Sequence, residues 1–298
     1  MKKTLSITLF LCLFSFVSFG QDYVDLARFH YSTTPQNEFD SIGGNTTVED
    51  FGLDVTLPIK LNESNVFLTG FNIDQITTKL HPSSSPITIS TINLKLGYNK
   101  KHSEKWSGTY MLLPKFSSDF KNITSKGYQF GALALMKYNK KINLKYNFGV
   151  YYNGELFGPF IVPLLGLHYK SENGKFEANL TLPIWADINY KLNKIVKVGA
   201  NFSAFVRSYH LSENNAYVVK KSNDVFAYLQ FNLTKSILLQ TKTGYTLGRS
   251  YKVYNDNDAA DLAVSAFRFG DDRTVLNPTF KDGLVFKMRL IYRFHIEK

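Results

Sequence analysis

From residue 21 to its end, the chain repeats units of about 10–14 residues in which apolar and polar side chains alternate, and a polar turn ends each unit. Segment 142–152 is the clearest case. One face carries only apolar and aromatic side chains, namely Ile142, Leu144, Tyr146, Phe148, Val150 and Tyr152, and the other carries Asn143, Lys145, Asn147 and Gly149. Successive side chains of a β-strand point to opposite faces, so this pattern predicts an all-β protein. No long segment has a convincing helical period.

The length of these units favours a membrane barrel over a soluble sandwich. Sandwich strands average about 5–6 residues, whereas strands of about 10–14 residues match a tilted crossing of a lipid bilayer. The apolar face of segment 128–138 is aromatic at both ends, as two membrane interfaces would select. The polar faces hold lysine, asparagine and glycine in mid-strand, which suits a wet lumen better than a dry core. Since lipid cannot satisfy an open sheet edge, the sheet must close.

The connections between the units alternate in length, which predicts an up-and-down antiparallel barrel with its short turns in the periplasm. Short turns fall at 62–63, 99–105, 139–141, 171–174, 192–194 and 234–235, and longer connections at 33–47, 80–86, 117–126, 153–158, 209–222 and 252–282. With a tight corner near Pro183, the count is 14 transmembrane strands, and both ends of the mature chain lie on the periplasmic side. Segments 176–185 and 186–192 could instead be one long kinked strand, and segment 261–269 could be a further strand. Because such barrels favour even counts, twelve strands is the second choice and 16 the third.

The N-terminus has the three parts of a secretory signal peptide. Lys2 and Lys3 precede the apolar stretch 5–17, and the small-x-small sequence 18–20 follows it. We therefore expect cleavage before Gln21, with residues 1–20 as signal peptide and 21–298 as one barrel domain. Cys12 leaves with the signal, so thiol chemistry is excluded. The formal net charge of the whole chain is +11, and we expect anionic lipid headgroups, not nucleic acid, as the partner of this charge.

The signal peptide, the strand-plus-connection units and the closing pattern Leu290-x-Tyr292-x-Phe294 resemble the outer-membrane β-barrel proteins of Gram-negative bacteria. In particular, the chain resembles the uncharacterised, channel-sized families among them. The resemblance implies an outer-membrane location, contact with outer-membrane lipid and lipopolysaccharide, and recognition of Leu290, Tyr292 and Phe294 by the barrel-assembly machinery. Residues 295–298 follow the final Phe, which departs from the usual pattern. Ordinary lipid-facing side chains are the alternative interpretation of these three residues.

No motif for catalysis or cofactor binding is found in the sequence. The six histidines have no metal-ligand spacing, and no nucleophile motif occurs. Asp256, Asp258 and Asp261 lack the glycine and the glutamate that a calcium loop requires. We therefore expect no metal, no cofactor and no enzymatic activity, with a membrane-embedded hydrolase as the alternative.

Charged side chains on the predicted inner face are the most informative remaining feature. The register predicts as lumen-lining residues Lys95, Arg207, Lys242, Lys287, Arg289, Asp54 and Asp187. Basic groups in a pore favour anions, so one hypothesis is a passive channel or transport barrel for small solutes with a mild anion preference. The same groups could instead pair with Asp54, Asp74, Glu177 and Asp187 and fill the lumen. A closed structural or interaction barrel is then the rival function, with the loops 33–47, 209–222 and 252–282 binding a partner or lipopolysaccharide.

Overall fold

The computed structural model describes residues 23–40 and 42–295, so the predicted signal peptide lies outside the described residues. The described chain is almost entirely β-strand. The strands are β1 (Tyr23–Glu38), β2 (Asn45–Lys60), β3 (Asn65–Thr78), β4 (Ile87–Lys101), β5 (Trp106–Ser118), β6 (Tyr128–Lys141), β7 (Leu144–Glu155), β8 (Gly158–Lys170), β9 (Phe176–Leu182), β10 (Trp185–Lys191), β11 (Val196–Leu211), β12 (Ala216–Asn232), β13 (Ile237–Asn255), β14 (Leu262–Val264), β15 (Phe267–Phe269) and β16 (Gly283–His295). A single 3-10 turn, η1 (Ser125–Gly127), precedes β6. No helix in the described part of the chain is long and apolar enough to cross a membrane.

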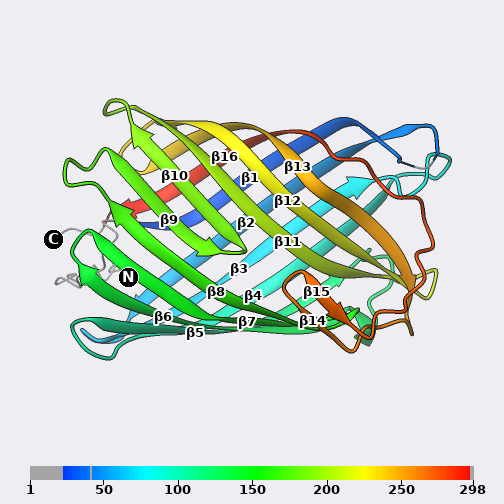
Figure 1. The fold of residues 1–298 in the computed structure, drawn as a ribbon, viewed down its shortest axis with the longest axis horizontal. Coiled ribbons are helices and arrows are strands. Elements are labelled where there is room, and N and C mark those ends of the chain that lie inside the picture. The colour runs from blue at the N-terminus through cyan, green and yellow to red at the C-terminus, as the bar shows by residue number, and fades with distance from the viewer. Residues whose placement is uncertain (1–22, 41, 296–298) are drawn as a thin grey trace, which may run out of the picture.

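Among the described residues, fourteen strands form a closed antiparallel barrel, as the sequence predicts (Figure 1). Strands β1 to β13 follow one another around the wall, β16 lies between β13 and β1, and the pairing of β8 with β9 completes the sheet. The short strands β14 and β15 belong to the last long connection. Tyr23 pairs with His295, so both ends of the described chain lie at one end of the barrel. We call this end the terminal end and the opposite one the far end.

The outer surface of the barrel is apolar over its whole circumference. Large apolar side chains there are 40% to 50% exposed, for example Phe29, Leu57, Leu94, Leu112, Phe148, Ile188, Leu229 and Leu290. Their neighbours in sequence face inward, as Arg28 does when it bonds to Asp54 across the strands β1 and β2. An unbroken apolar exterior around a polar interior is the surface of a barrel that spans a lipid bilayer.

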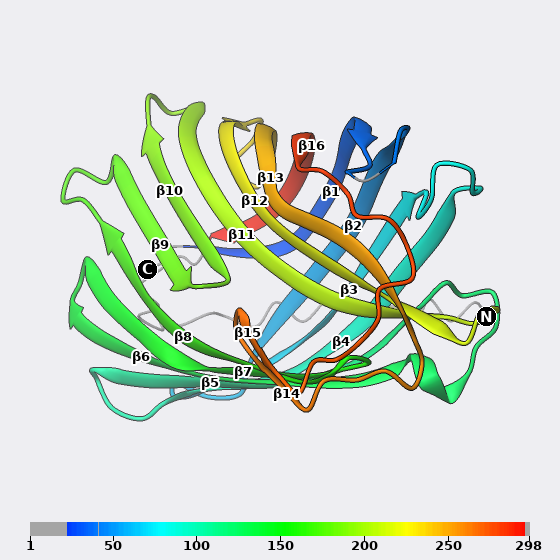
Figure 2. The same cartoon turned by 45° about the vertical axis from the view of Figure 1, so that its right-hand side comes forward.

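The hairpin β9–β10 is only half as long as its neighbours, as Figure 2 shows. The chain turns at Pro183, where the predicted corner is confirmed, and the amide of Ile184 donates to the carbonyl of Thr181 at 3.1 Å. Strand β9 therefore pairs with β8 only from Leu165 to Lys170. Nearer the far end, β14 pairs with β8 instead, in parallel orientation, through Ala263 and Val264. The last connection thus replaces part of the missing wall.

The far halves of β11, β12 and β13 leave the wall together and fold into the barrel, where Figure 2 shows β11 and β12 reaching toward β4 and β5. Strand β12 stays paired with β13 as far as Asn255, whereas β13 pairs with β16 only as far as Thr246. The register breaks between Lys221 and Asn223, opposite Gly248, whose φ of 64° is a left-handed conformation that glycine adopts readily. Such a bulge bends the paired strands. Beyond it, His210 on β11 pairs with Ser118 on β5, across the barrel. We call residues 207–220 the inserted hairpin.

The structure corrects four of the predicted connections. The predicted loop 209–222 is strand except for residues 212–215, and the predicted loop 252–282 begins with strand to Asn255 and contains β14 and β15. The predicted loop 33–47 is also mostly strand, and the connection predicted at 153–158 consists only of Leu156 and Phe157. Both faces of the hairpin are buried, so its sequence lacks the lipid-facing apolar side and the lumen-facing polar side of a membrane strand.

Two apolar clusters hold the inserted hairpin, one on each of its faces. Tyr209 and Val218 pack against Ile76 and Ile89 of the wall strands β3 and β4. Tyr217 and Val219 pack in the other cluster. This second cluster also contains Phe157, Phe160, Val162, Leu164, Tyr254 and Ala263. The hairpin therefore fills the barrel between opposite walls at the far end, and its strands are buried on both sides.

Candidate functional site

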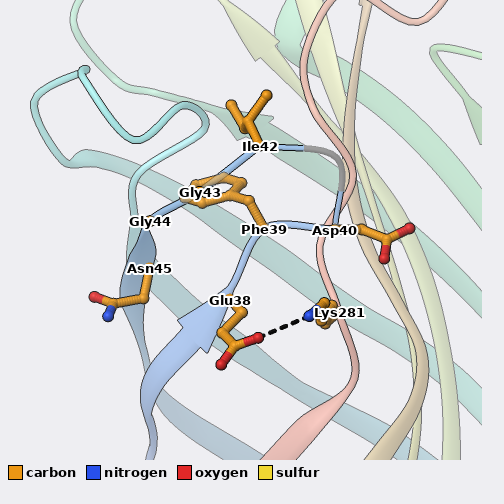
Figure 3. Close-up of a pocket in the computed structure, with 8 residues that line it drawn as sticks. All are labelled: Glu38, Phe39, Asp40, Ile42, Gly43, Gly44, Asn45 and Lys281. Carbon is orange, nitrogen blue, oxygen red and sulfur yellow. Dashed lines mark hydrogen bonds and ion pairs between the residues drawn. The ribbon is translucent and has the colours of Figure 1, made fainter.

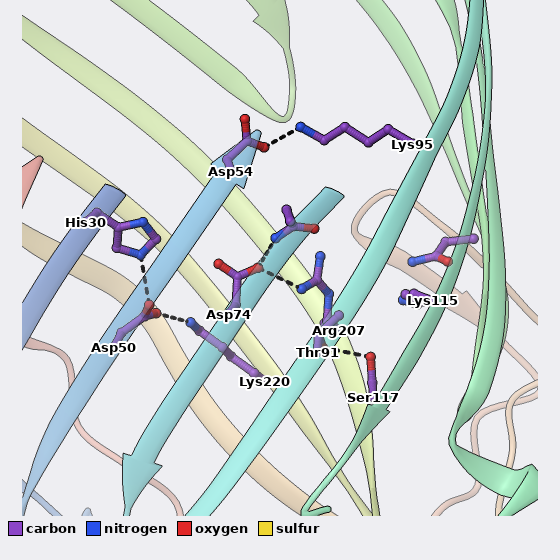
Figure 4. Close-up of polar contacts among 12 residues, drawn as sticks. His30, Asp50, Asp54, Asp74, Thr91, Lys95, Lys115, Ser117, Arg207 and Lys220 are labelled. Carbon is purple, nitrogen blue, oxygen red and sulfur yellow. Dashed lines mark hydrogen bonds and ion pairs between the residues drawn. The ribbon is translucent and has the colours of Figure 1, made fainter. Parts of the chain in front are cut away.

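The lumen beside the inserted hairpin is crossed by a chain of ion pairs (Figure 4). Asp50 accepts hydrogen bonds from His30 at 3.0 Å and from Lys220 at 2.8 Å. Lys220 comes from the hairpin and Asp50 from the wall, so this pair joins the two. Asp74 of β3 binds Arg207 at 3.1 Å in the same way. Opposite charges at these distances in a partly dry interior fix the position of the hairpin.

Further along the same wall, Asp54 holds two cations. Lys95 donates to it at 2.5 Å and Arg28 at 3.3 Å, and the Lys95 ammonium also binds the hydroxyl of Thr56. The strand register explains the contact between Arg28 and Asp54, because the two residues lie directly opposite each other on neighbouring strands. Both cations on this side of the lumen therefore have a carboxylate partner.

Glu155 makes the most buried polar contact between hairpin and wall. Its side chain is 0% exposed, and its carboxylate accepts hydrogen bonds from Ser208 through the amide at 2.6 Å and the hydroxyl at 2.5 Å. Lys115 binds the same carboxylate at 2.6 Å, and Asn153 donates to it as well. Gln129 donates to the carbonyl of Ser208 at 3.1 Å. The β11 edge, which has no strand partner at this point, thus obtains its hydrogen bonds from side chains of β6 and β7.

The last connection is fastened to the same end of the barrel by Arg273. Its guanidinium lies 4.2 Å from the ring centroid of Tyr254 and donates to Asp271 at 2.6 Å. The hydrogen bond from Arg273 lowers the pKa of Asp271 below its ordinary value. At the outer rim, Glu38 and Lys281 form an ion pair at 2.8 Å beside a shallow surface pocket (Figure 3). The loops and the hairpin together cover the far end.

Three inward cations without an ion-pair partner among the described residues lie together. Lys242 on β13 and Lys287 on β16 are directly opposite cross-strand neighbours, and Arg289 follows two residues later on the same face. Lys242 donates to the side-chain oxygen of Asn201 at 2.7 Å and lies 4.8 Å from the ring centroid of Tyr228. None of the ion pairs among the described residues includes Lys242, Lys287 or Arg289. Like charges directly opposite each other destabilise a sheet, so their presence here needs a reason.

The structure places the predicted site residues in two separate groups. Lys95 and Asp54 bond to each other, Arg207 bonds to Asp74, and Asp187 accepts a hydrogen bond from Tyr228 at 3.0 Å. The basic residues Lys242, Lys287 and Arg289 lie together on β13 and β16. Leu290, Tyr292 and Phe294 are on the exterior of β16, where they are 40% to 51% exposed.

Sequence reasoning missed the residues that hold the hairpin. Glu155, Ser208 and Lys220 fall in or beside segments that were predicted to be loops, and Lys115 stands just before another. The one available signal is the continued strand pattern of 216–220, in which aromatic and β-branched residues stand without a polar turn. No group of three or more histidine, cysteine or acidic side chains in the described chain could hold a metal ion.

Comparison with known proteins identifies a family. A family model described as Domain of unknown function (DUF6268) matches residues 13–292, and no curated protein matches the sequence. An outer membrane channel from Pseudomonas putida F1 is 8% identical with a TM-score of 0.44, covering 90% of this chain and 93% of that one. The translocator domain of the autotransporter NalP from Neisseria meningitidis is 11% identical with a TM-score of 0.38, covering 90% and 88%. The toluene transporter TodX from Pseudomonas putida is 10% identical with a TM-score of 0.35, covering 92% and 90%. With the family match and the fourteen-stranded barrel, the predicted resemblance to an uncharacterised family of outer-membrane barrels is confirmed.

Proposed function

This chain belongs to the DUF6268 family, whose function is unknown, and we propose that it is an outer-membrane conduit for small solutes with a mild preference for anions. The conduit is closed at its far end by the inserted hairpin, which must move before solutes pass. Short turns join the strands at the terminal end, so that end faces the periplasm and the hairpin closes the extracellular mouth. Lipid and lipopolysaccharide surround the barrel, and the barrel-assembly machinery reads its last strand.

The polar, charged interior carries this proposal. A barrel that serves only as a platform can fill its interior with apolar side chains, which pack without the cost of burying charge. Here inward lysine and arginine residues continue from the terminal end, where Arg293 binds Asp25 at 2.6 Å, to the base of the hairpin at Arg207. Ionised groups are costly to bury without water or a partner, so we infer that water enters the lumen below the hairpin.

The test uses a disulfide that fastens the hairpin reversibly. Ser118 and His210 are register partners on β5 and β11, which brings their Cα atoms within the range that a disulfide requires. The chain from Gln21 contains no cysteine of its own, because the single cysteine is Cys12. We expect the variant Ser118→Cys/His210→Cys, folded in detergent and inserted in a planar bilayer, to give conductance steps under reducing conditions that oxidation abolishes. The reversal potential under a KCl gradient should show a mild anion selectivity.

The rival function gives the opposite result. A closed interaction barrel, whose extracellular loops bind a partner or lipopolysaccharide, gives no conductance steps in either redox state, although circular dichroism shows folded β-structure. If a variant in which a substitution of Glu155 weakens the contact with the hairpin also shows no conductance steps, the conduit proposal is overturned. Steps of equal size in the oxidised and reduced states would overturn the closing role of the hairpin alone.

A further inference from the structure

We infer that Lys242, Lys287 and Arg289 form a binding site for a small organic carboxylate inside the lumen. The site deepens the proposed function, on which it rests for its purpose, because it would give the conduit its preference for anions. Binding itself can be measured without conduction, so the two ideas can fail separately.

Five other inward cations differ from these three in having a close carboxylate partner. Lys95, Lys115, Arg207, Lys220 and Arg293 each have a carboxylate oxygen within 2.5 to 3.1 Å. A barrel that only needed to neutralise its interior would supply carboxylates to Lys242, Lys287 and Arg289 as well. Instead, the sheet register places two lysines face to face. Such an arrangement is stabilised when an anion lies between the two ammonium groups.

The neighbouring carboxylates are occupied elsewhere. Asp187 accepts hydrogen bonds from Tyr228 at 3.0 Å and Asn189 at 3.1 Å. Asp50 is bound by His30 and Lys220, and Asp54 by Lys95 and Arg28. These carboxylates contribute to the field around the cluster, but among the described residues none of them forms an ion pair with its three cations. The direct contacts of the cluster are therefore left to a solute.

The surroundings indicate what kind of anion fits. Arg289 offers a planar guanidinium, which matches the two oxygens of a carboxylate, and the lysines add two point charges beside it. Phe226 and Tyr228 of β12 border the cluster: the Lys242 ammonium lies 4.8 Å from the Tyr228 ring centroid, and the Lys287 ammonium 6.0 Å from that of Phe226. Both rings are buried, so they make the surroundings of the cations apolar. Apolar surroundings favour an organic acid over a strongly hydrated inorganic anion.

Lys242 is 4% exposed, whereas Lys287 and Arg289 are only half-buried. Lys242 is therefore held in place by Asn201 and Tyr228, while the other two cations remain open to the lumen. A solute that arrives along the barrel axis meets Lys287 and Arg289 first and reaches Lys242 only when it is bound. This geometry suits a site that a permeating anion occupies and leaves.

Isothermal titration calorimetry of the folded barrel in neutral detergent at low salt tests the site, with benzoate and inorganic phosphate as probes. We expect benzoate to bind more tightly than phosphate. Lys242→Gln and Lys287→Gln should each weaken benzoate binding at least about tenfold, because each removes a charge-assisted contact. Lys287→Arg keeps the charge and should retain most of the affinity.

The matched control is Lys197→Gln. It removes an inward lysine on β11 that lies 3.9 Å from Glu177, away from the cluster and toward the terminal end. Its benzoate affinity should stay within about twofold of the wild type, because Lys197 is not one of the three cations of the site and Glu177 offsets its charge. Equal losses of benzoate affinity in Lys197→Gln and Lys287→Gln would show that the overall positive potential of the lumen attracts benzoate, and would overturn a defined site. Absent benzoate binding, or tighter binding of phosphate, overturns the carboxylate assignment even if the barrel conducts. Benzoate binding in a barrel that never conducts overturns only the proposed function.

Discussion

Replacing Glu155 by Gln should release the inserted hairpin from the wall. The substitution removes the charge that holds Lys115 at 2.6 Å, in a place where the two side chains are 0% and 3% exposed. Breaking a buried pair from one side costs about 3–5 kcal/mol, because the remaining charge has no partner. The shape of the residue is kept, so the barrel wall itself is little affected. The cost falls on the docked position of the hairpin, where Ser208 donates twice to the same carboxylate.

This cost converts to a shift of about 150- to 4000-fold in the ratio of docked to undocked hairpin. Hydrogen-deuterium exchange of the amides in 205–220 measures the ratio directly, since these amides exchange when the hairpin opens. We expect exchange in Glu155→Gln to be faster by that factor, while strands such as β3 keep their protection. The double variant Glu155→Gln/Lys115→Met removes both buried charges and should recover most of the protection.

Two results would refute this reasoning. If exchange in 205–220 stays within about threefold of the wild type, the Glu155 carboxylate does not hold the hairpin, and the apolar clusters alone do so. If Glu155→Gln loses protection over the whole barrel, the residue stabilises the wall instead. The double variant separates these cases from simple misfolding, because it should be protected only if the unpaired Lys115 charge is the cause.

Three further predictions concern packing, membrane contact and pH. Gly149→Ala should lower the yield of folded barrel, because a Cβ there would lie 2.1 Å from a carbonyl oxygen of β6. Gly154→Ala, where the nearest atom to the added Cβ is 3.5 Å away, should fold normally. The heat-dependent mobility shift of the refolded barrel on a denaturing gel measures the folded fraction of both variants. Leu94→Arg places a charge on the lipid-facing side of β4 and should cost about 2–4 kcal/mol in urea titrations of the barrel in vesicles. Arg273 lowers the pKa of Asp271, so the stability that this pair gives the last connection is present at neutral pH and is lost as the pH falls below about 4. Protease cleavage within 256–282 should therefore become faster in acid, and Asp271→Asn should make the rate nearly independent of pH.

The sequence predicts the barrel well because a wall strand carries its own signal. One face must meet lipid and the other the lumen, so the side chains of β7, β11 and β16 alternate along the chain. The same local pattern predicts the corner at Pro183, because proline cannot continue a ladder of hydrogen bonds. Local sequence patterns therefore predict the strands of the wall but not the segments that leave it.

The inserted hairpin was missed because its environment is set by distant residues. Tyr217 and Val218 are both fully buried, and no rule of alternation distinguishes such a strand from a loop that is rich in apolar residues. The partners of Ser208 come from β6 and β7, more than fifty positions earlier in the chain. The face-to-face lysines of the cluster could be placed on the inner side by pattern. The sequence could not predict that these lysines lack carboxylate partners, because the pairing depends on the rotamers of every neighbouring side chain.

The short length of hairpin β9–β10 explains why the inserted hairpin leaves the wall. Because β9 and β10 stop at Pro183, β11 has no partner on that side beyond Ala204, whose amide donates to Ile184 at 2.9 Å. An unpaired strand edge cannot face hydrocarbon, so the far half of β11 cannot stay in the wall. It turns inward, where Glu155, Gln129 and the edge of β5 satisfy its backbone, and β14 takes its place beside β8. The closure of the barrel mouth is therefore built into the strand lengths, and any motion that opens the mouth must give the β11 edge a new set of partners, of which water entering the lumen is the simplest.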